Sequence, residues 1–370
     1  MQLTEASRDA VLKPLTTVVG IVERRNTLPI LANVLIRKQA EAVEFIANDL
    51  EVQITTRSAF GVGDETQSTT VAARKLLDIL RALPESSVVK MSLDDNRLTV
   101  QAGRSRFALQ TMEAIDYPLV NPVDQWDASF SMPQKALRDL FNQVHFAMAH
   151  QDIRHYLNGL LLVLEPGKIR VVATDGHRLA HAGTALEAQS ATQDVIIPRK
   201  TVHEMQRLLA DDEQSMVQVD VSGSQIRFRF EHIEVISKLI EGKYPDYQRV
   251  IPTDYECHFD VGREALQAAL QRAAILTTDK LRGVRIQLGD HLMRVSASNT
   301  ENEEAREEIE IDYPHGPLDV AFNVTYLLDV LASLKADSVR WFIQPNTSSS
   351  VLITLAGDDE FRYVVMPMRI

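Results

Sequence analysis

The sequence predicts an α+β protein built from three copies of one domain. Three segments, each an extended apolar stretch that runs into an amphipathic helix, begin at Val71, Val195 and Val320, which are 124 and 125 residues apart. A second landmark, an alternating strand closed by a polar pair, recurs in step at Asn48-Asp49, Thr174-Asp175 and Ser298-Asn299. This period is far longer than the roughly 20–50 residues of a solenoid repeat, so it indicates repeated domains.

Two helices are predicted in each copy, because apolar residues recur there at helical spacing. The earlier helix carries Val11, Leu12, Leu15, Val18, Val19 and Val22 in the first copy, Leu137, Leu140, Phe141 and Val144 in the second, and Leu266, Ala269, Leu270 and Ala273 in the third. The later helix carries Leu76, Leu77 and Leu80, then Met205, Leu208 and Leu209, then Leu327, Leu328 and Leu331. Short alternating runs, such as residues 43–47, 169–173 and 292–297, predict strands. We place the domain boundaries near residues 125 and 254, which gives domains 1–125, 126–253 and 254–370.

The composition is that of a globular protein in a reducing compartment. The chain has 370 residues, of which 45% are hydrophobic, enough for two or three domain cores. The longest clear apolar run, residues 160–164, is too short to span a membrane. Residues 1–9 lack the basic-then-apolar order of a secretory signal. The lone Cys257 cannot form an internal disulfide. We therefore expect a cytoplasmic protein without a membrane partner.

Charge is distributed unevenly along the chain, whose net charge is −12. Residues 1–125 and 126–253 each hold 14 basic and 16 acidic residues, whereas residues 254–370 hold 11 and 19. The acids of the last third are concentrated at Glu301, Glu303, Glu304, Glu307, Glu308, Glu310 and Asp312. Basic residues lie at helix ends and on helix faces: Lys13, Arg24, Arg25, Arg74, Lys75, Arg81, Lys135, Arg138, Arg199, Lys200, Arg207, Arg272 and Lys335. If the repeated helices share one surface, these residues form a basic lining inside an acidic body.

Candidate catalytic chemistry is confined to two short clusters. His150 and Asp152 in one, and Asp175 and His177 in the other, could ligate a divalent metal or perform acid–base work. They raise an alternative function, a metal-dependent phosphohydrolase. Neither cluster has the His or Cys spacing of an established metal motif, and there is no Walker-type glycine loop or Gly-x-Ser-x-Gly motif. We therefore favour a protein that is not an enzyme and has no cofactor or metal. A β-rich scaffold that binds only proteins is a third possibility.

The apolar C-terminus has two interpretations. Val364, Met366 and Met368 are either core residues of a last strand or the lining of a binding site. The segment from Asp175 to Leu179 bears on the same choice, because a strand that turns there places an apolar side chain beside a polar rim. Spacing alone favours the core interpretation.

Several motifs together resemble one family, the bacterial DNA polymerase sliding clamp, which is the beta subunit of the replicative polymerase. The motifs are Met148-Ala-His-Gln-Asp-Ile-Arg154, Tyr156-Leu-Asn-Gly, Ala173-Thr-Asp-Gly-His-Arg-Leu-Ala180, Pro198-Arg-Lys200, Tyr244-Pro-Asp-Tyr247, Phe322-Asn-Val-Thr-Tyr326 and Tyr363-Val-Val-Met-Pro-Met-Arg369. The resemblance covers the whole chain. It implies three DNA-clamp domains, each with two helices packed on curved antiparallel sheets.

The resemblance also implies a ring-shaped, head-to-tail homodimer of six domains. It places two sets of residues on opposite sides of the dimer interface, with an apolar centre and complementary charges around it. The first set is Lys75, Ile79, Arg104, Phe107 and Leu109, and the second is Ile275, Leu276, Glu301, Glu303 and Glu304.

Two binding activities follow from the resemblance. The helices would face a central hole holding duplex DNA, contacted without regard to sequence by Arg25, His150, Gln151, His155, Tyr156, Arg74 and Lys200. A pocket would take short apolar motifs of the replicative polymerase, the clamp loader, other polymerases, mismatch repair proteins and ligase. Its implied lining is Arg154, Tyr156, Leu157, Thr174, Gly176, His177, Arg178, Leu179, Pro245, Val250, Asn323, Tyr326, Val364, Met366, Pro367, Met368 and Arg369.

Overall fold

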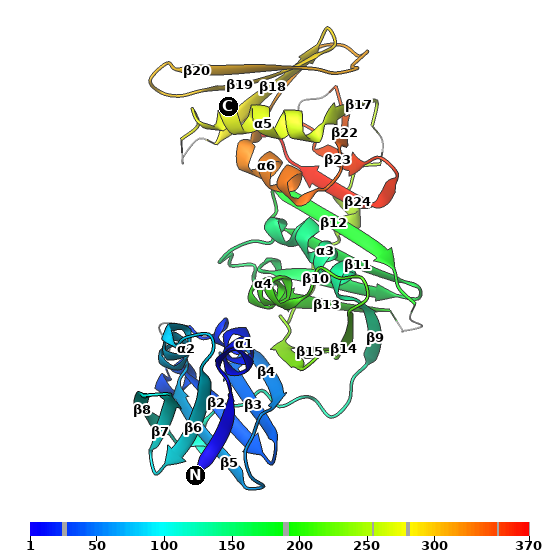
Figure 1. Cartoon of the computed structure of the whole chain (residues 1–370). Coiled ribbons are helices and arrows are strands. Elements are labelled where there is room, and N and C mark those ends of the chain that lie inside the picture. Colours follow the sequence, from blue (N-terminus) through cyan, green and yellow to red (C-terminus); the bar gives the residue numbers. More distant parts are fainter. Residues whose placement is uncertain (24–27, 188–191, 254, 279–281, 346–347, 370) are drawn as a thin grey trace. The chain divides into compact units, whose positions relative to one another are not determined.

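The computed structural model describes the chain apart from residues 24–27, 188–191, 254, 279–281, 346–347 and 370. Within the described residues there are six α-helices and 24 β-strands, arranged in three sheets (Figure 1). The residues fall into two compact units, Met1–Lys135 with Arg207–Leu239, and Ala136–Gln206 with Ile240–Ile370. The strands of each sheet pair antiparallel, so the predicted α+β class is confirmed.

The first unit contains a sheet of 12 strands in the order β1-β6-β7-β8-β5-β2-β3-β4-β16-β15-β14-β9. Its strands are β1 (Gln2–Ser7), β2 (Asn33–Gln39), β3 (Ala42–Asn48), β4 (Val52–Ala59), β5 (Thr66–Ala72), β6 (Val88–Asp94), β7 (Arg97–Ala102), β8 (Ser105–Met112), β9 (Ala128–Pro133), β14 (Met216–Val221), β15 (Gln225–Phe230) and β16 (Ile233–Lys238). The sheet crosses the first predicted domain boundary, because β4 pairs with β16 through Ile54 and Val235.

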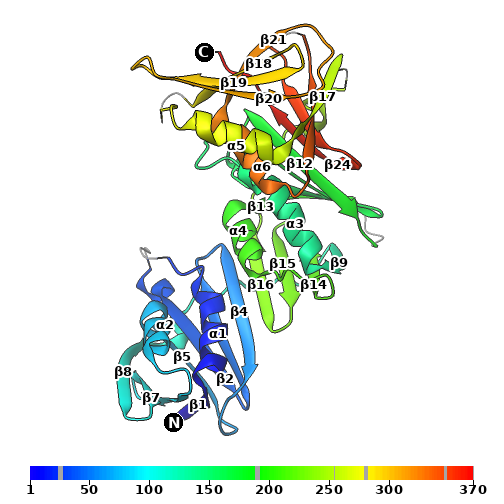
Figure 2. The ribbon, with the colours of Figure 1, turned by 45° about the horizontal axis from the view of Figure 1, so that its top comes forward.

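Two helices of this unit bury the apolar faces that the sequence predicts. In α1 (Arg8–Val19), Val11, Leu15 and Val18 are fully buried, and in α2 (Ala73–Ala82) Leu76 and Leu80 are. Burying such side chains contributes about 1.5–3 kcal/mol each. The helical pattern extends to Val22, but α1 ends at Val19, before Gly20, because glycine weakens a helix. The two helices contact each other (Figures 1 and 2).

The second unit contains two sheets, one of eight strands in the order β13-β10-β11-β12-β24-β23-β22-β17 and one of four in the order β20-β19-β18-β21. The strands are β10 (Gly159–Glu165), β11 (Lys168–Thr174), β12 (Arg178–Ala185), β13 (Gln193–Pro198), β17 (Cys257–Gly262), β18 (Gly283–Gly289), β19 (Leu292–Ser298), β20 (Glu304–Glu310), β21 (Leu318–Asn323), β22 (Ser338–Ile343), β23 (Val351–Leu355) and β24 (Asp358–Val365). The pairing of β12 with β24 joins the second and third repeats in one sheet.

The helices of the second unit also follow the predicted pattern. They are α3 (Gln134–Val144), whose first two residues belong to the first unit, α4 (Arg199–Leu208), whose last two do, α5 (Arg263–Ala274) and α6 (Val324–Ser333). Each buries its apolar stripe, for example Phe141 in α3, Met205 in α4 and Leu327 in α6. Helices α5 and α6 contact each other (Figure 2).

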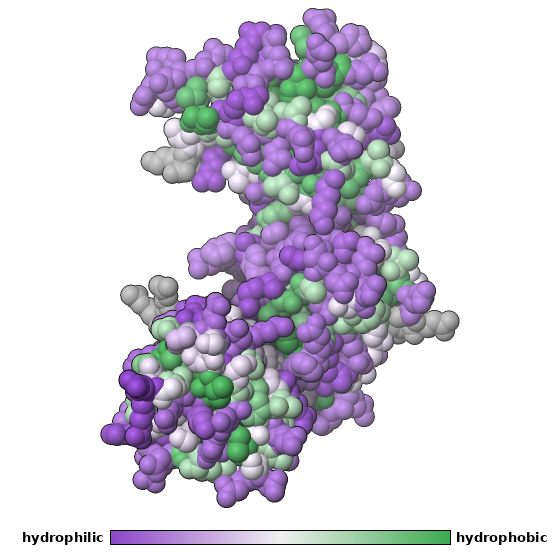
Figure 3. Space-filling model, in the orientation of Figure 1, coloured by the Kyte–Doolittle hydropathy of each residue, from purple (hydrophilic) through white to green (hydrophobic). Residues whose placement is uncertain are grey.

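The face of the surface drawn in Figure 3 is mainly polar. Hydrophilic residues predominate there, and hydrophobic ones lie in separate patches. No helix in the described part of the chain is long and apolar enough to cross a membrane. Cys257 is buried, and burial raises the pKa of its thiol. The domain boundaries at residues 125 and 254 stay a prediction.

Candidate functional site

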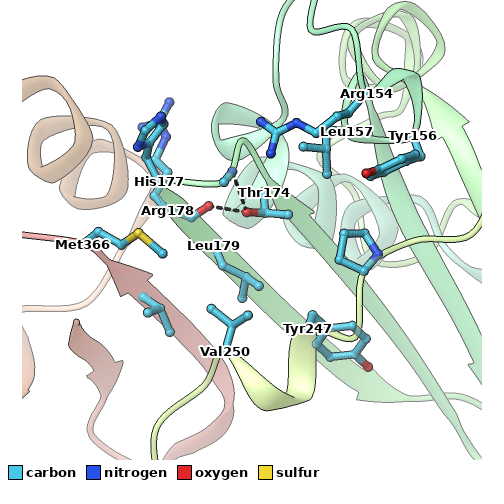
Figure 4. A pocket seen from close by; sticks show the side chains of 13 residues that line it. Arg154, Tyr156, Leu157, Thr174, His177, Arg178, Leu179, Tyr247, Val250 and Met366 are labelled. Carbon is cyan, nitrogen blue, oxygen red and sulfur yellow. Dashed lines mark hydrogen bonds between the residues drawn. The ribbon is translucent and has the colours of Figure 1, made fainter. Parts of the chain in front are cut away.

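The turn between β11 and β12 is held by its own side chains. The carboxylate of Asp175 accepts hydrogen bonds from the backbone N–H groups of His177 (2.9 Å) and Arg178 (3.0 Å). The hydroxyl of Thr174 donates to the Arg178 carbonyl at 2.6 Å and accepts from the Gly176 N–H at 3.1 Å (Figure 4). Gly176 has a φ of +91°, which L side chains rarely adopt. A Cβ there would lie 3.1 Å from Nη1 of Arg154, so glycine fits this position best.

Arg178 fixes the turn to the rest of the second unit. Its Nη1 lies 2.6 Å from Oδ2 of Asp329 in α6, and its Nη2 donates to the carbonyl of Phe146 at 2.6 Å. Its guanidinium also lies over the Tyr326 ring, 4.3 Å from the centroid, a cation–π contact. The side chain is only 9% exposed. The start of β12 is therefore connected to elements of both the second and the third repeat.

Arg154 forms part of the rim beside this turn. Its Nη2 lies 2.8 Å from Oδ2 of Asp152 and donates to the Asp175 carbonyl at 3.2 Å. Hydrogen bonds from the Arg154 side chain, more than any other cause, lower the pKa of the Asp152 carboxyl to about 2. The 3₁₀ turn His155–Leu157 follows and places Tyr156 and Leu157 beside the same hollow.

These elements surround one apolar cavity of about 180 Å³ (Figure 4). Leu157, Leu179 and Val364 are at most 2% exposed and belong to one core cluster at its base. The lining consists of Arg154, Tyr156, Leu157, Thr174, Gly176, His177, Arg178, Leu179, Pro245, Tyr247, Val250, Val364 and Met366. An apolar base with a few polar groups on the rim suits the apolar side chains of a short peptide.

The structure brings together most, but not all, of the residues expected in the pocket. Tyr247 lines the cavity but was not predicted, although it closes the Tyr244-Pro-Asp-Tyr247 motif. Asn323 instead caps α6, accepting from the Thr325 N–H at 2.9 Å, and Tyr326 stacks on Arg178. Pro367, Met368 and Arg369 line another cavity, which includes Arg285, Asp319, Val320, Ala321 and Ser348.

The residues expected near DNA are spread over several elements. His150, Gln151 and His155 are exposed in the segment between α3 and β10, whereas Tyr156 lines the pocket. Arg74 in α2 is exposed and donates to the Val22 carbonyl at 2.6 Å. Lys200 lies half-buried in α4. Arg25 lies outside the described residues.

Six of the ten residues expected at a dimer interface lie along or shortly before two strand edges, those of β8 and β20. In the first unit, residues 105–110 of β8, which include Phe107 and Leu109, pair with β7 alone among the described strands. Arg104 precedes β8, and Lys75 and Ile79 lie in α2. In the second unit, β20 is the terminal strand of its sheet and pairs with β19. Glu301, Glu303 and Glu304 lie before or at its start and are exposed; Ile275, which is 76% exposed, and Leu276 follow α5.

The phosphohydrolase alternative is not supported. The Asp152 carboxylate pairs with Arg154, and the Asp175 carboxylate is bound by its own turn and by Arg178. Among the described residues, no three His, Cys, Asp or Glu side chains are grouped so that they could hold a metal ion.

The protein consists of three repeated α+β domains, and its candidate sites lie on turns and strand edges. These features define a class of non-catalytic binding proteins with internal domain repeats. The sequence matches the DNA polymerase III beta subunit family in all three parts: the N-terminal domain at residues 1–121, the central domain at 131–246 and the C-terminal domain at 248–369. The chain therefore belongs to the family of DNA polymerase III beta subunits, the beta sliding clamps. Membership in this non-catalytic family also argues against an enzyme.

Relatives and solved structures agree over the full chain. The chain is 43% identical to the beta sliding clamp of Pseudomonas aeruginosa over 366 residues and 40% identical to that of Escherichia coli over 365, covering 98% of each chain. It is similar to the crystal structure of the Pseudomonas aeruginosa clamp bound to griselimycin, with a TM-score of 0.95, 41% identity and complete coverage of both chains. It is also similar to the Caulobacter crescentus clamp with PEG bound to its putative beta-motif tethering region, with a TM-score of 0.93, 35% identity and complete coverage.

Proposed function

We propose that this chain acts as a DNA sliding clamp. Two chains would close head to tail into a ring around duplex DNA, and the pocket would tether DNA-processing proteins by short apolar motifs. The observation that carries this proposal is membership in the sliding-clamp family over the whole chain, together with the apolar cavity at the β11–β12 turn. A clamp raises processivity because the closed ring is linked around the duplex, so that a bound polymerase cannot diffuse away. It needs no catalytic group.

The proposed ring closes through the two strand edges. The edge of β8 carries Arg106 and follows Arg104, whereas β20 and the turn before it are rich in glutamate. An antiparallel pair formed across these edges would satisfy their backbone groups, and opposite charges would favour the correct orientation. A head-to-tail contact of this kind uses different surfaces on each chain and closes if the rotation is right. Ile79, Phe107 and Leu109 would meet Ile275 and Leu276 at the apolar centre, with Lys75 among the charges around it.

The proposed DNA contacts are weak and independent of sequence. Lys and Arg contacts to phosphates position a duplex but do not specify its bases, and weak contacts permit sliding. Arg25, Arg74, His150, Gln151, His155, Tyr156 and Lys200 are the proposed contacts. The net charge of −12 disfavours DNA binding on the outer surface.

The proposed partners at the pocket are the replicative polymerase, the clamp loader, other polymerases, mismatch repair proteins and ligase. The griselimycin-bound clamp and the clamp with PEG at its tethering region show that relatives take ligands. The five predicted residues outside the cavity, Asn323, Tyr326, Pro367, Met368 and Arg369, would support the pocket or extend it. We also propose a cytoplasmic location, where these partners act.

Retention on DNA of different topology tests the proposed function. The protein is loaded onto nicked circular DNA with a clamp loader and ATP, isolated by gel filtration, and the DNA is then linearised. Retention on the circle and release from the linear form are expected, with retention restored when the linear ends carry bulky protein blocks. Equal retention on circular and unblocked linear DNA would contradict a topological link. Sedimentation at micromolar concentration should show a dimer.

A further inference from the structure

A second hollow lies beside the pocket, across the segment of residues 244–247. Its volume is about 490 Å³, and it shares Pro245 and Tyr247 with the pocket. We call it the acidic hollow; it is lined by Leu161, Val163, Glu165, Thr192, Asp194, Ile196, Gly242, Lys243, Tyr244, Pro245, Asp246, Tyr247 and Gln248. One wall is formed by β10 and β13, and the other by the chain that crosses above them. Both hollows therefore border the same short ridge.

The ridge is fixed to the sheet beneath it. Tyr244 is buried, and its hydroxyl accepts a hydrogen bond from the Thr174 N–H at 3.1 Å. The Ile240 N–H donates to the Ile196 carbonyl at 2.9 Å. Leu161 and Ile196, at the base of the acidic hollow, belong to the same core cluster as the residues at the base of the pocket. The two hollows are therefore built on one packed core.

The charged groups that face the acidic hollow are mostly carboxylates. Glu165 and Asp194 lie on neighbouring strands, Asp246 lies on the ridge, and Lys243 is the one cation among the lining residues. Glu165 is paired with Arg170 at 2.7 Å, and Asp246 with Arg249 at 2.8 Å. Burial, and then the charge of Glu165, raise the pKa of the Asp194 carboxyl. In the described part of the chain no cation forms an ion pair with Asp194, so a positive group beside it would be stabilised.

We propose that the acidic hollow binds a basic side chain, Lys or Arg, of the peptide segment that flanks the apolar motif in the pocket. This inference rests on the proposed function of the pocket. The lysine or arginine stem would lie along Leu161 and Ile196 while its charged end meets Asp194. An extended peptide advances about 3.3 Å per residue, and Pro245 and Tyr247 face both hollows, so a few residues suffice to cross the ridge. Partners with a basic flank would be preferred over partners with the same motif and a neutral flank.

Two peptides that differ only in their flanks test this proposal on the full-length protein. Both carry the same apolar motif, one with two lysines on each side and one with alanines, and affinities are measured by fluorescence anisotropy at low and physiological salt. The lysine peptide should bind about fivefold more tightly, the upper range for a partly exposed ion pair. The preference should decline as pH falls through the pKa of Asp194, because the cation favours the charged carboxylate.

The Asp194→Asn variant identifies the site of any preference. It should bind both peptides equally, with the affinity of the alanine peptide unchanged. Glu241→Gln is the matched control, because it removes the same charge from an exposed residue that precedes Gly242 of the hollow but does not itself line it; it should keep the preference. Equal binding by the unmodified protein, or a preference that survives in Asp194→Asn, would overturn the inference. If neither peptide binds, the proposed function of the pocket is what fails.

Discussion

The turn between β3 and β4 and the turn between β11 and β12 are copies of one structure in different surroundings. In the first, Asp49 accepts hydrogen bonds from two backbone N–H groups that follow it, at 3.0 and 2.7 Å. In the second, Asp175 does the same at 2.9 and 3.0 Å. The residue after each aspartate has a positive φ, +78° at Leu50 and +91° at Gly176. Repetition has therefore preserved the turn itself.

The neighbours of the two turns differ, and they explain why only one borders the apolar pocket. In the first repeat, Asn48 donates to the Pro118 carbonyl at 2.6 Å, so a connecting chain is attached to the turn. In the second, the rim residue Arg154 approaches Gly176, and Arg178 extends to Asp329 in the third repeat. Strand β24 supplies Val364, and Met366 follows directly after that strand. The binding site thus arises from the joint between two repeats, while the repeated scaffold is shared.

The largest expected effect comes from Arg178→Ala, which breaks that joint. The change leaves Asp329 and the Phe146 carbonyl without their guanidinium partner, and removing one member of a buried ion pair costs about 3–5 kcal/mol. Since Asp329 is 33% exposed, we expect the lower end, measured as the loss in free energy of unfolding in urea. Arg37→Ala, which breaks the more exposed pair with Glu44 in the first unit, should cost only about 0.2–1 kcal/mol. Similar losses in the free energy of unfolding for both variants would show that Arg178 does not hold the second and third repeats together.

A smaller effect should distinguish the two positive-φ residues. Gly176→Val adds a branched side chain where φ is +91° and where a Cβ would lie 3.1 Å from Nη1 of Arg154. Strain of about 1–3 kcal/mol should displace Arg154 and weaken binding of an apolar-motif peptide at least tenfold, which corresponds to about 1.4 kcal/mol. Leu50→Gly relieves strain at the matching position and should leave peptide affinity unchanged. If both substitutions changed the peptide affinity equally, the turn between β11 and β12 would not be the one that forms the peptide pocket.

The smallest effect concerns pH. Because the pKa of Asp152 is lowered to about 2 by Arg154, their pairing is fully present above the ordinary Asp pKa of about 3.9. It is lost as pH falls from there through the folded value. Titration of Asp152 should therefore not change peptide affinity between pH 5 and 8, and an NMR titration of its carboxyl carbon should show the low midpoint. A titration midpoint near 4 would indicate that Asp152 does not pair with Arg154 in solution.

Much of the fold could be predicted from the sequence because the repeats carry local signals. Helices α1 to α6 follow apolar spacing, and each polar pair, such as Thr174-Asp175, ends a strand. The pairing of β4 with β16 could not be predicted, because no local pattern specifies which strand of the second repeat extends the first sheet. It is also the reason that the compact units differ from the repeats.

The pocket was predictable in part, through resemblance more than through spacing. Tyr247 was missed because it lies in a 3₁₀ turn, where no periodicity marks a side chain that faces a cavity. The resemblance predicts Asn323 and Tyr326 in the lining; the structure has Asn323 as a helix cap and Tyr326 stacked on Arg178, and their role in the site stays a prediction. The ion pair between Arg178 and Asp329 joins residues 151 apart in sequence, a separation at which sequence patterns contain no pairing information.

The most direct test of the account is the number of peptides that one chain binds. An apolar-motif peptide is titrated into the full-length protein by isothermal calorimetry, with Gly176→Val and Leu50→Gly measured alongside. If only the joint between the second and third repeats forms the site, one peptide should bind per chain, tightly in Leu50→Gly and weakly in Gly176→Val. Two or three equivalent sites per chain, or a single site that Gly176→Val leaves intact, would contradict it.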